Sequence, residues 1–126
     1  MRRGKAIAAA MLALGGAGVA AGASGAADDQ LATASATKKV KVADNFYSPK
    51  KLTVVKGTTI KWVWSNLNAD SHDVYLYKRP KGVARFQSAP AATHFSFKRK
   101  LKKVGTYKVL CTFHENMSMR IDVKRP

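Results

Sequence analysis

The sequence predicts an all-β domain, a sandwich or barrel of seven or eight strands. From Lys38 onward, short segments in which apolar and polar residues alternate are separated by turn residues such as glycine, proline and asparagine. No helical period persists for more than about two turns, and the alternating segments recur at nearly regular spacing. These two observations indicate one β domain, with no second domain and no internal repeat.

The expected strands are bounded by turn signals and show the two-residue period of a half-buried strand. They are residues 39–42, 52–55, 58–64, 72–77, 93–99, 106–111 and 119–123. The pattern is clearest in 58–64, where Ile60, Trp62 and Trp64 share one face. In 119–123, Met119 shares a face with Ile121 and Val123, so the sequence places it in the core.

The first residues have the pattern of a secretory signal. A cationic start precedes an apolar stretch rich in alanine and glycine, and small residues follow before Asp28. We therefore expect a signal peptide at 1–27 with cleavage at about 23–27, a flexible lead-in at 28–37 and the folded domain at 38–126. The apolar stretch is short for a bilayer span, so we expect no membrane span in the mature protein. The expected location is the periplasm, the extracellular space or the cell envelope.

The chain is strongly basic, with 23 lysines and arginines against seven acidic residues and a formal charge of +16. Loss of Arg2, Arg3 and Lys5 with the signal leaves +13. Such a charge favours anionic partners and predicts an acidic docking surface on any protein partner. A basic module that binds polyanions is an alternative. Nucleic-acid binding would need basic residues interleaved with exposed aromatics on one face, and export argues against nucleic acid as the partner.

The residues that carry chemistry gather in one short stretch. Cys111, His114 and Met117 offer a thiolate, an imidazole and a thioether within seven residues. An unpaired cysteine in an exported domain indicates a use other than a disulfide bond. Two histidines, one cysteine and a distant methionine form the donor set of copper electron-transfer centres. This stretch lacks only the second histidine.

Strand phase selects that histidine. In 72–77, His72 shares its face with Val74 and Leu76, and Asp73 falls on the outward face. In 93–99, His94 falls on the outward face and is expected to be a surface residue. We therefore expect His72 to complete the set.

Two methionines compete for the distant position. Met117 lies in the expected loop, where its side chain can turn back over a metal. Met119 has the phase of a core residue, and methionine often fills gaps in cores. Met117 is the favoured ligand and Met119 the alternative.

In combination, these motifs resemble a small cupredoxin of the plastocyanin/amicyanin type over about residues 40–123. The matching pieces are Phe46-Tyr47-Ser48-Pro49, residues 52–57, residues 60–66, His72-Asp73-Val74, Phe86-Gln87-Ser88 and Gly105-Thr106-Tyr107 followed by Cys111, His114 and Met117. The resemblance implies a Greek-key β-sandwich with one type 1 copper ion. It implies His72, Cys111 and His114 as equatorial ligands and Met117 as the weak axial ligand. Met119 in that place would give a plastocyanin-like spacing.

Two positions depart from the family pattern. Asp73 stands where members often have asparagine, and an acid there could still accept a hydrogen bond from Thr112. Its charge is expected to alter the potential of the copper ion. Glu115 stands where proline is frequent and adds a negative charge beside His114.

The resemblance implies a one-electron carrier that cycles between Cu(I) and Cu(II). With the export signal, we expect it to act outside the cytoplasm, and we expect a monomer. His114 would be the route for the electron, the partner would be a redox protein, and no enzymatic activity is expected. Copper storage, delivery or resistance is the alternative, since it could use the same four ligands.

Overall fold

The computed structural model describes residues 36–126, and in this part of the chain all regular structure is β. It contains eight strands, which confirms the predicted fold class. The expected signal peptide at 1–27 lies outside the described residues, as does nearly all of the expected lead-in at 28–37. The first strand described begins at Thr37. None of the described residues forms a helix long and apolar enough to cross a bilayer.

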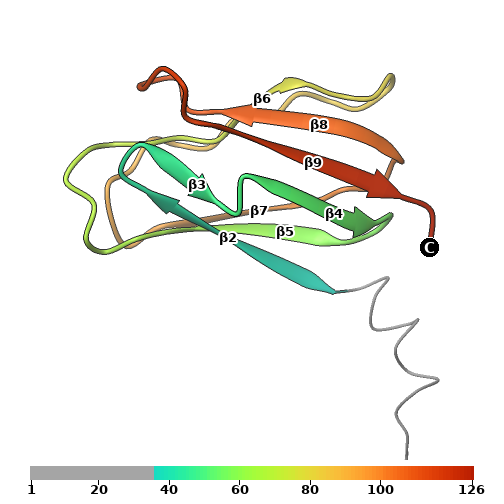
Figure 1. Cartoon of the computed structure of the whole chain (residues 1–126), viewed down its shortest axis with the longest axis horizontal. Helices are drawn as coiled ribbons and strands as arrows, with labels where there is room; N and C mark the ends of the chain where they lie inside the picture. Colours follow the sequence, from blue (N-terminus) through green and yellow to red (C-terminus); the bar gives the residue numbers. More distant parts are fainter. Residues whose placement is uncertain (1–35) are drawn as a thin grey trace, which may run out of the picture. The chain divides into compact units, whose positions relative to one another are not determined.

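The strands form two four-stranded sheets, seen as two layers in Figure 1. The first has the order β3-β2-β5-β7 and consists of β2 (Thr37–Ala43), β3 (Phe46–Ser48), β5 (Thr59–Trp64) and β7 (Ser96–Lys100). The second has the order β4-β9-β8-β6 and consists of β4 (Lys51–Val55), β6 (Tyr75–Lys78), β8 (Gly105–Leu110) and β9 (Ser118–Lys124). β2 pairs with β5 and β4 with β9 in parallel, and the other pairs are antiparallel. Both sheets are therefore mixed.

The core lies between the sheets, where the sequence alternation placed it. Ile60, Trp62 and Trp64 of β5 are buried, as are Ile121 and Val123 of β9. Complete burial of one such side chain contributes about 1.5–3 kcal/mol, so these faces fix the register of their strands.

Two strands begin later than the sequence indicated. The expected strand 72–77 begins at Tyr75, and the expected strand 93–99 begins at Ser96. His72 instead forms an isolated antiparallel bridge with Ala91. Asp73 is buried although its expected phase pointed outward, because outside a regular strand alternate side chains need not take opposite faces.

Four connections meet at one end of the sandwich, away from the C-terminus (Figure 1). They are residues 44–45, 65–74, 88–95 and 111–117, here called the loop end. Asp44 accepts a hydrogen bond from Ala69 N–H, and His72 exchanges backbone hydrogen bonds with Ala91. The fourth connection joins through Thr112, whose N–H donates to Asp73. The loop end is therefore one hydrogen-bonded unit.

Candidate metal centre

Two of the expected donors lie in the connection between β8 and β9. Cys111 follows directly after β8 and is buried on the same face as Val109. Its N–H donates to the carbonyl of Met117 at 2.9 Å, which closes the loop. Asn116 has a positive φ of 66°, a conformation that asparagine tolerates better than most residues. The closed loop holds His114 beside Cys111.

The third donor, His72, comes from the long connection between β5 and β6 and has no exposed surface. Its N–H donates to Ala91 O at 2.9 Å, and its carbonyl accepts from Ala91 N–H at 3.1 Å and from Trp64 Nε1–H at 3.1 Å. Three hydrogen bonds thus fix the backbone at His72 although no strand contains it.

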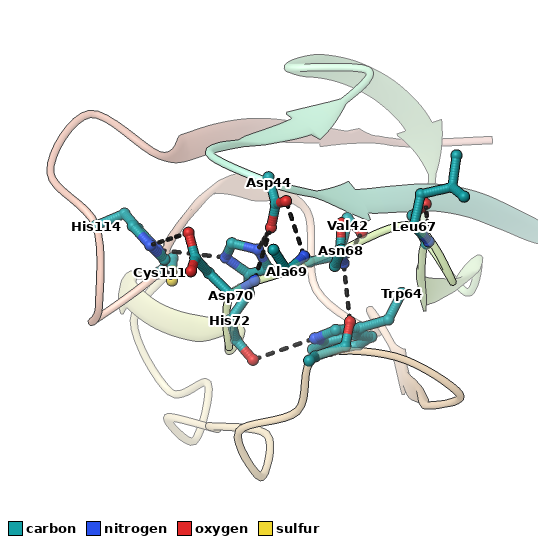
Figure 2. A network of polar contacts seen from close by, with 12 residues as sticks. Val42, Asp44, Trp64, Leu67, Asn68, Ala69, Asp70, His72, Cys111 and His114 are labelled. Atoms are coloured by element: carbon teal, nitrogen blue, oxygen red, sulfur yellow. Dashed lines mark hydrogen bonds and ion pairs between the residues drawn. The ribbon is translucent and has the colours of Figure 1, made fainter.

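The three donors converge on one point (Figure 2). One ligating atom from each of His72, Cys111 and His114 lies within 4.8 Å of the others. The two Nδ1 atoms are 3.3 Å apart, and Cys111 Sγ is 3.6 Å from His114 Nδ1. Metal–nitrogen and metal–sulfur bonds of about 2.0–2.3 Å imply trigonal edges of roughly 3.5–4 Å. Two of the observed separations, 3.3 and 3.6 Å, are close to these edges, and all three donor atoms lie within 4.8 Å of one another, so the residues can hold a trigonal ion. This donor set is the one copper takes in blue-copper proteins.

A carboxylate sets the tautomer of His72. Asp44 Oδ1 lies 2.8 Å from His72 Nε2, and the two oxygens of Asp44 also accept from Ala69 N–H at 2.9 Å and Asp70 N–H at 3.2 Å (Figure 2). These bonds lower the pKa of Asp44, the Ala69 N–H contributing most and His72 next. The ionised carboxylate can only accept, so Nε2 carries the proton and the lone pair of Nδ1 faces Cys111 and His114.

Sequence reasoning missed Asp44. Its contact with His72 spans 28 positions and depends on the parallel pairing of β2 with β5, which sequence periodicity does not predict. One signal was available: Asp44 is the only acidic residue between Asp29 and Asp70 in a basic chain. A carboxylate commonly orients a metal-binding histidine, so an isolated acidic residue is a candidate for that role.

Asp73 makes the hydrogen bond expected of it. Its carboxylate accepts from Thr112 N–H and from Thr112 Oγ1–H, both at 2.7 Å, and from Gln87 Nε2–H at 3.0 Å. The Tyr47 hydroxyl donates to the Asp73 carbonyl at 2.5 Å. Burial raises the pKa of Tyr47, with smaller contributions from Cys111 and Asp73, so the hydroxyl remains a donor. Asp73 therefore joins the Cys111 loop to the chain around His72.

The two methionines lie in different environments. Met119 is buried on β9, and its sulfur accepts the Trp62 Nε1–H at 3.3 Å. Met117 is buried at the end of the loop, and its carbonyl accepts a hydrogen bond from Cys111 N–H. The Met119 thioether thus has a partner in the core, whereas Met117 belongs to the loop that carries two of the donors.

His94 and His114 are exposed in different ways. His94 is exposed, and its Nδ1 lies 3.0 Å from the hydroxyl of its neighbour Thr93. His114 is 22% exposed, and its Nε2 lies 3.8 Å from Asp70 Oδ2. Next to it, the ring of Phe113 is 54% exposed. His114 is the donor residue through which the cluster reaches the surface.

Comparisons with known proteins agree on the family. A family model described as a cupredoxin-like domain matches residues 6–123. Amicyanin from Paracoccus versutus superposes with a TM-score of 0.61 at 22% identity, covering 70% of this chain and 81% of amicyanin. A pseudoazurin from Sinorhizobium meliloti gives a TM-score of 0.59 at 20% identity, covering 71% and 75%.

A copper-containing nitrite reductase from Thermus scotoductus SA-01 gives a TM-score of 0.62 at 23% identity. The match covers 71% of this chain but only 23% of the reductase. A comparison with curated protein sequences finds no significant match. Because the family model spans nearly the whole sequence and the two-sheet architecture agrees with it, the chain belongs to the cupredoxin family.

Proposed function

We propose that this protein carries single electrons between redox proteins, with one type 1 copper ion as its cofactor. The observation that carries the proposal is the convergence of His72 Nδ1, His114 Nδ1 and Cys111 Sγ within 4.8 Å in a folded, hydrogen-bonded setting. These three residues would hold the ion, and Met117 would be its weak axial ligand. When bound, copper supplies a one-electron couple between Cu(I) and Cu(II).

The protein residues contribute rigidity to this function. Asp44 holds the His72 ring, Ala91 and Trp64 hold its backbone, and Asp73 holds the loop of Cys111. Ligands fixed in this way change little between two oxidation states, which lowers the reorganisation that accompanies electron transfer. The same bonds constrain the ring orientation and the electron density of the ligands.

The exposure of the donors supports a route for the electron. His72 and Cys111 are buried, whereas His114 reaches solvent with Phe113 beside it. An electron that enters or leaves through the His114 ring avoids the thickness of the sandwich. The burial of the other donors leaves little access for a substrate, which supports a carrier rather than an enzyme.

We also propose that the protein is exported, with residues 1–27 as the signal peptide and 38–126 as the functional domain. The support is the charge and hydropathy pattern of the first residues and the single cysteine. The mature protein would act as a monomer in the periplasm or at the cell envelope. Detection of the processed form in an extracytoplasmic fraction, with an N-terminus near residue 28, tests this proposal.

One spectrum tests the copper site. The oxidised, copper-loaded protein without residues 1–27 should show an intense visible band from Cys111 thiolate bound to Cu(II), and Cys111→Ser should remove it. A colourless Cu(II) form of the unsubstituted protein would refute the site. Rapid self-exchange measured by NMR line broadening would support the carrier. Slow exchange combined with release of copper to an acceptor would instead establish storage or delivery.

A further inference from the structure

The loop end has a charge opposite to that of the rest of the domain. Residues 36–126 contain 20 of the 23 lysines and arginines of the chain, and none lies at residues 44–45, 65–74, 88–95 or 111–117. An even spread would place about six among these 27 positions. Four of the five acidic residues in 36–126 lie there instead: Asp44, Asp70, Asp73 and Glu115. Cationic side chains are thus confined to the remainder of the domain.

Three of these acids can act on a partner. Asp73 is buried and bonded internally, whereas the side chain of Asp70 is 60% exposed and that of Asp44 is 35% exposed. Glu115 is exposed and directly follows His114. Asp70 reaches to 3.8 Å from His114 Nε2 (Figure 2). The exposed edge of His114 therefore lies beside the carboxylate of Asp70, with Glu115 next in the sequence.

The same end also presents apolar surface. Phe113, beside His114, is 54% exposed, and Leu67, in the connection between β5 and β6, is 91% exposed. Burial of such apolar surface against a partner is favourable, so these side chains can contribute to an interface. The loop end thus combines exposed apolar groups, exposed carboxylates and no lysine or arginine.

The distance over which charges act decides which residues influence a docked partner. At physiological ionic strength the Debye length is about 8 Å, so charges at the far end of the sandwich are largely screened at contact. A partner at His114 meets Asp70 and Glu115 rather than the net charge of +13. A cationic partner that approaches another face of the domain comes within the Debye length of lysines and arginines and is repelled, which favours approach from the loop end.

From these observations, and resting on the proposed electron-carrier function, we propose that the loop end docks a redox protein whose surface around its own redox centre is rich in lysine and arginine. This is the reverse of the acidic docking surface that net charge alone predicts. Net charge averages over the molecule, whereas recognition at His114 depends on the residues within a few ångströms of it.

The first test uses two small oxidants of opposite charge. The reduced, copper-loaded protein is oxidised in a stopped-flow spectrometer by the cation tris(phenanthroline)cobalt(III) or the anion hexacyanoferrate(III). At low ionic strength, the double substitution Asp70→Asn with Glu115→Gln should slow oxidation by the cation and accelerate oxidation by the anion, each by about threefold. The control Asp122→Asn, on β9 outside the loop end, should change neither rate appreciably. Equal effects of the control and the double substitution would overturn the proposal.

A second test is independent of copper and of electron transfer. Pentalysine is titrated into the ¹⁵N-labelled, metal-free protein while amide chemical shifts are followed. Shifts confined to residues 69–71 and 112–116, abolished by the double substitution and kept in Asp122→Asn, support the proposal. Shifts absent from these residues overturn it. If the copper-loaded protein lacks its visible band, the proposed function fails while this titration still decides the charge of the surface.

Sedimentation velocity at low ionic strength completes the test. Outside its loop end, a second copy of this protein also presents a cationic surface. Self-association through the loop end is therefore the alternative to a separate redox partner. A single monomeric species over the measured concentrations supports a separate redox partner. Self-association that the double substitution abolishes would overturn the proposal in favour of a second copy.

Discussion

Asp73→Ala should destabilise the metal-free protein strongly. The Asp73 side chain is 2% exposed and accepts three hydrogen bonds, two from Thr112 and one from Gln87. Alanine leaves these donors without their acceptor at the junction of two loops. A hydrogen bond to a charged group contributes about 1.5–3 kcal/mol, and the three bonds share one carboxylate, so they do not add.

The size of the effect follows from two opposing terms. Loss of the acceptor for three donors is partly offset because the buried carboxylate no longer has to be desolvated. We expect a net loss of about 3 kcal/mol in the free energy of unfolding. For a domain of this size, each kcal/mol lost from the free energy of unfolding lowers the midpoint of thermal unfolding by about 4–8 °C. The midpoint should therefore fall by about 12–24 °C.

Asparagine at the same position separates hydrogen bonding from charge. Its oxygen can still accept from Thr112 N–H, and its amide can donate to the Thr112 hydroxyl. Gln87 can rotate its amide to present its oxygen. Asp73→Asn should therefore lower the free energy of unfolding by less than about 1 kcal/mol. In the copper-loaded protein, Asp73→Asn should raise the reduction potential. The carboxylate near the Cys111 loop stabilises the oxidised ion, and asparagine lacks that negative charge.

Thermal unfolding of the metal-free proteins, followed by far-UV circular dichroism with reversibility checked, measures both variants. Asp122→Asn is the control. Asp122 pairs with the exposed Arg120 and accepts from Thr106 Oγ1–H, and the asparagine oxygen can still accept, so the midpoint of thermal unfolding should change little. A loss below about 1 kcal/mol for Asp73→Ala would refute the reasoning. An asparagine variant as unstable as the alanine variant would show that charge, not hydrogen bonding, joins the loops.

Substitutions at the other residues of the site give distinct results. His72→Ala should abolish the visible band of the copper-loaded protein, whereas His94→Ala should leave it intact; a band that survives the first change would exclude His72 as a ligand. Met117→Leu should shift the reduction potential in voltammetry with little effect on unfolding. Met119→Leu should lower the unfolding midpoint with little effect on potential, because the indole N–H of Trp62 loses its acceptor. The reverse pair of results would make Met119 the axial ligand.

Strand phase predicted most of the fold, because alternate side chains of a strand face opposite sides of a sheet. It placed Ile60, Trp62 and Trp64 in the core and gave the inward face of the last strand correctly. The predicted start of the strand at His72 was wrong, because the regular strand does not begin until Tyr75. His72 is nevertheless buried as its phase predicted, whereas Asp73 is buried although its phase pointed outward. There, consecutive residues are buried together because loops from other parts of the chain cover them.

The donor cluster was predictable to the extent that its members lie close in sequence. Cys111 and His114 are three positions apart, and one closed loop brings them together. The Asp44 contact was not predictable in this way, because it needs the pairing of β2 with β5 and the course of the connection after β5. The clustering of acids around His114 also depends on topology, since their positions are scattered along the chain.

The two histidines of the cluster are held differently, and this difference divides their roles. His72 is buried, its Nε2–H is bonded to Asp44, and its backbone is bonded to Ala91 and Trp64. It is therefore fixed before any ion binds. His114 turns Nδ1 toward the cluster, its side chain is 22% exposed, and its Nε2 lies 3.8 Å from Asp70 Oδ2, beyond a direct hydrogen bond. Its outer nitrogen thus has no close protein partner among the described residues. In the proposed function, the buried His72 would hold the geometry of the site, and the exposed edge of His114 would exchange electrons with another protein.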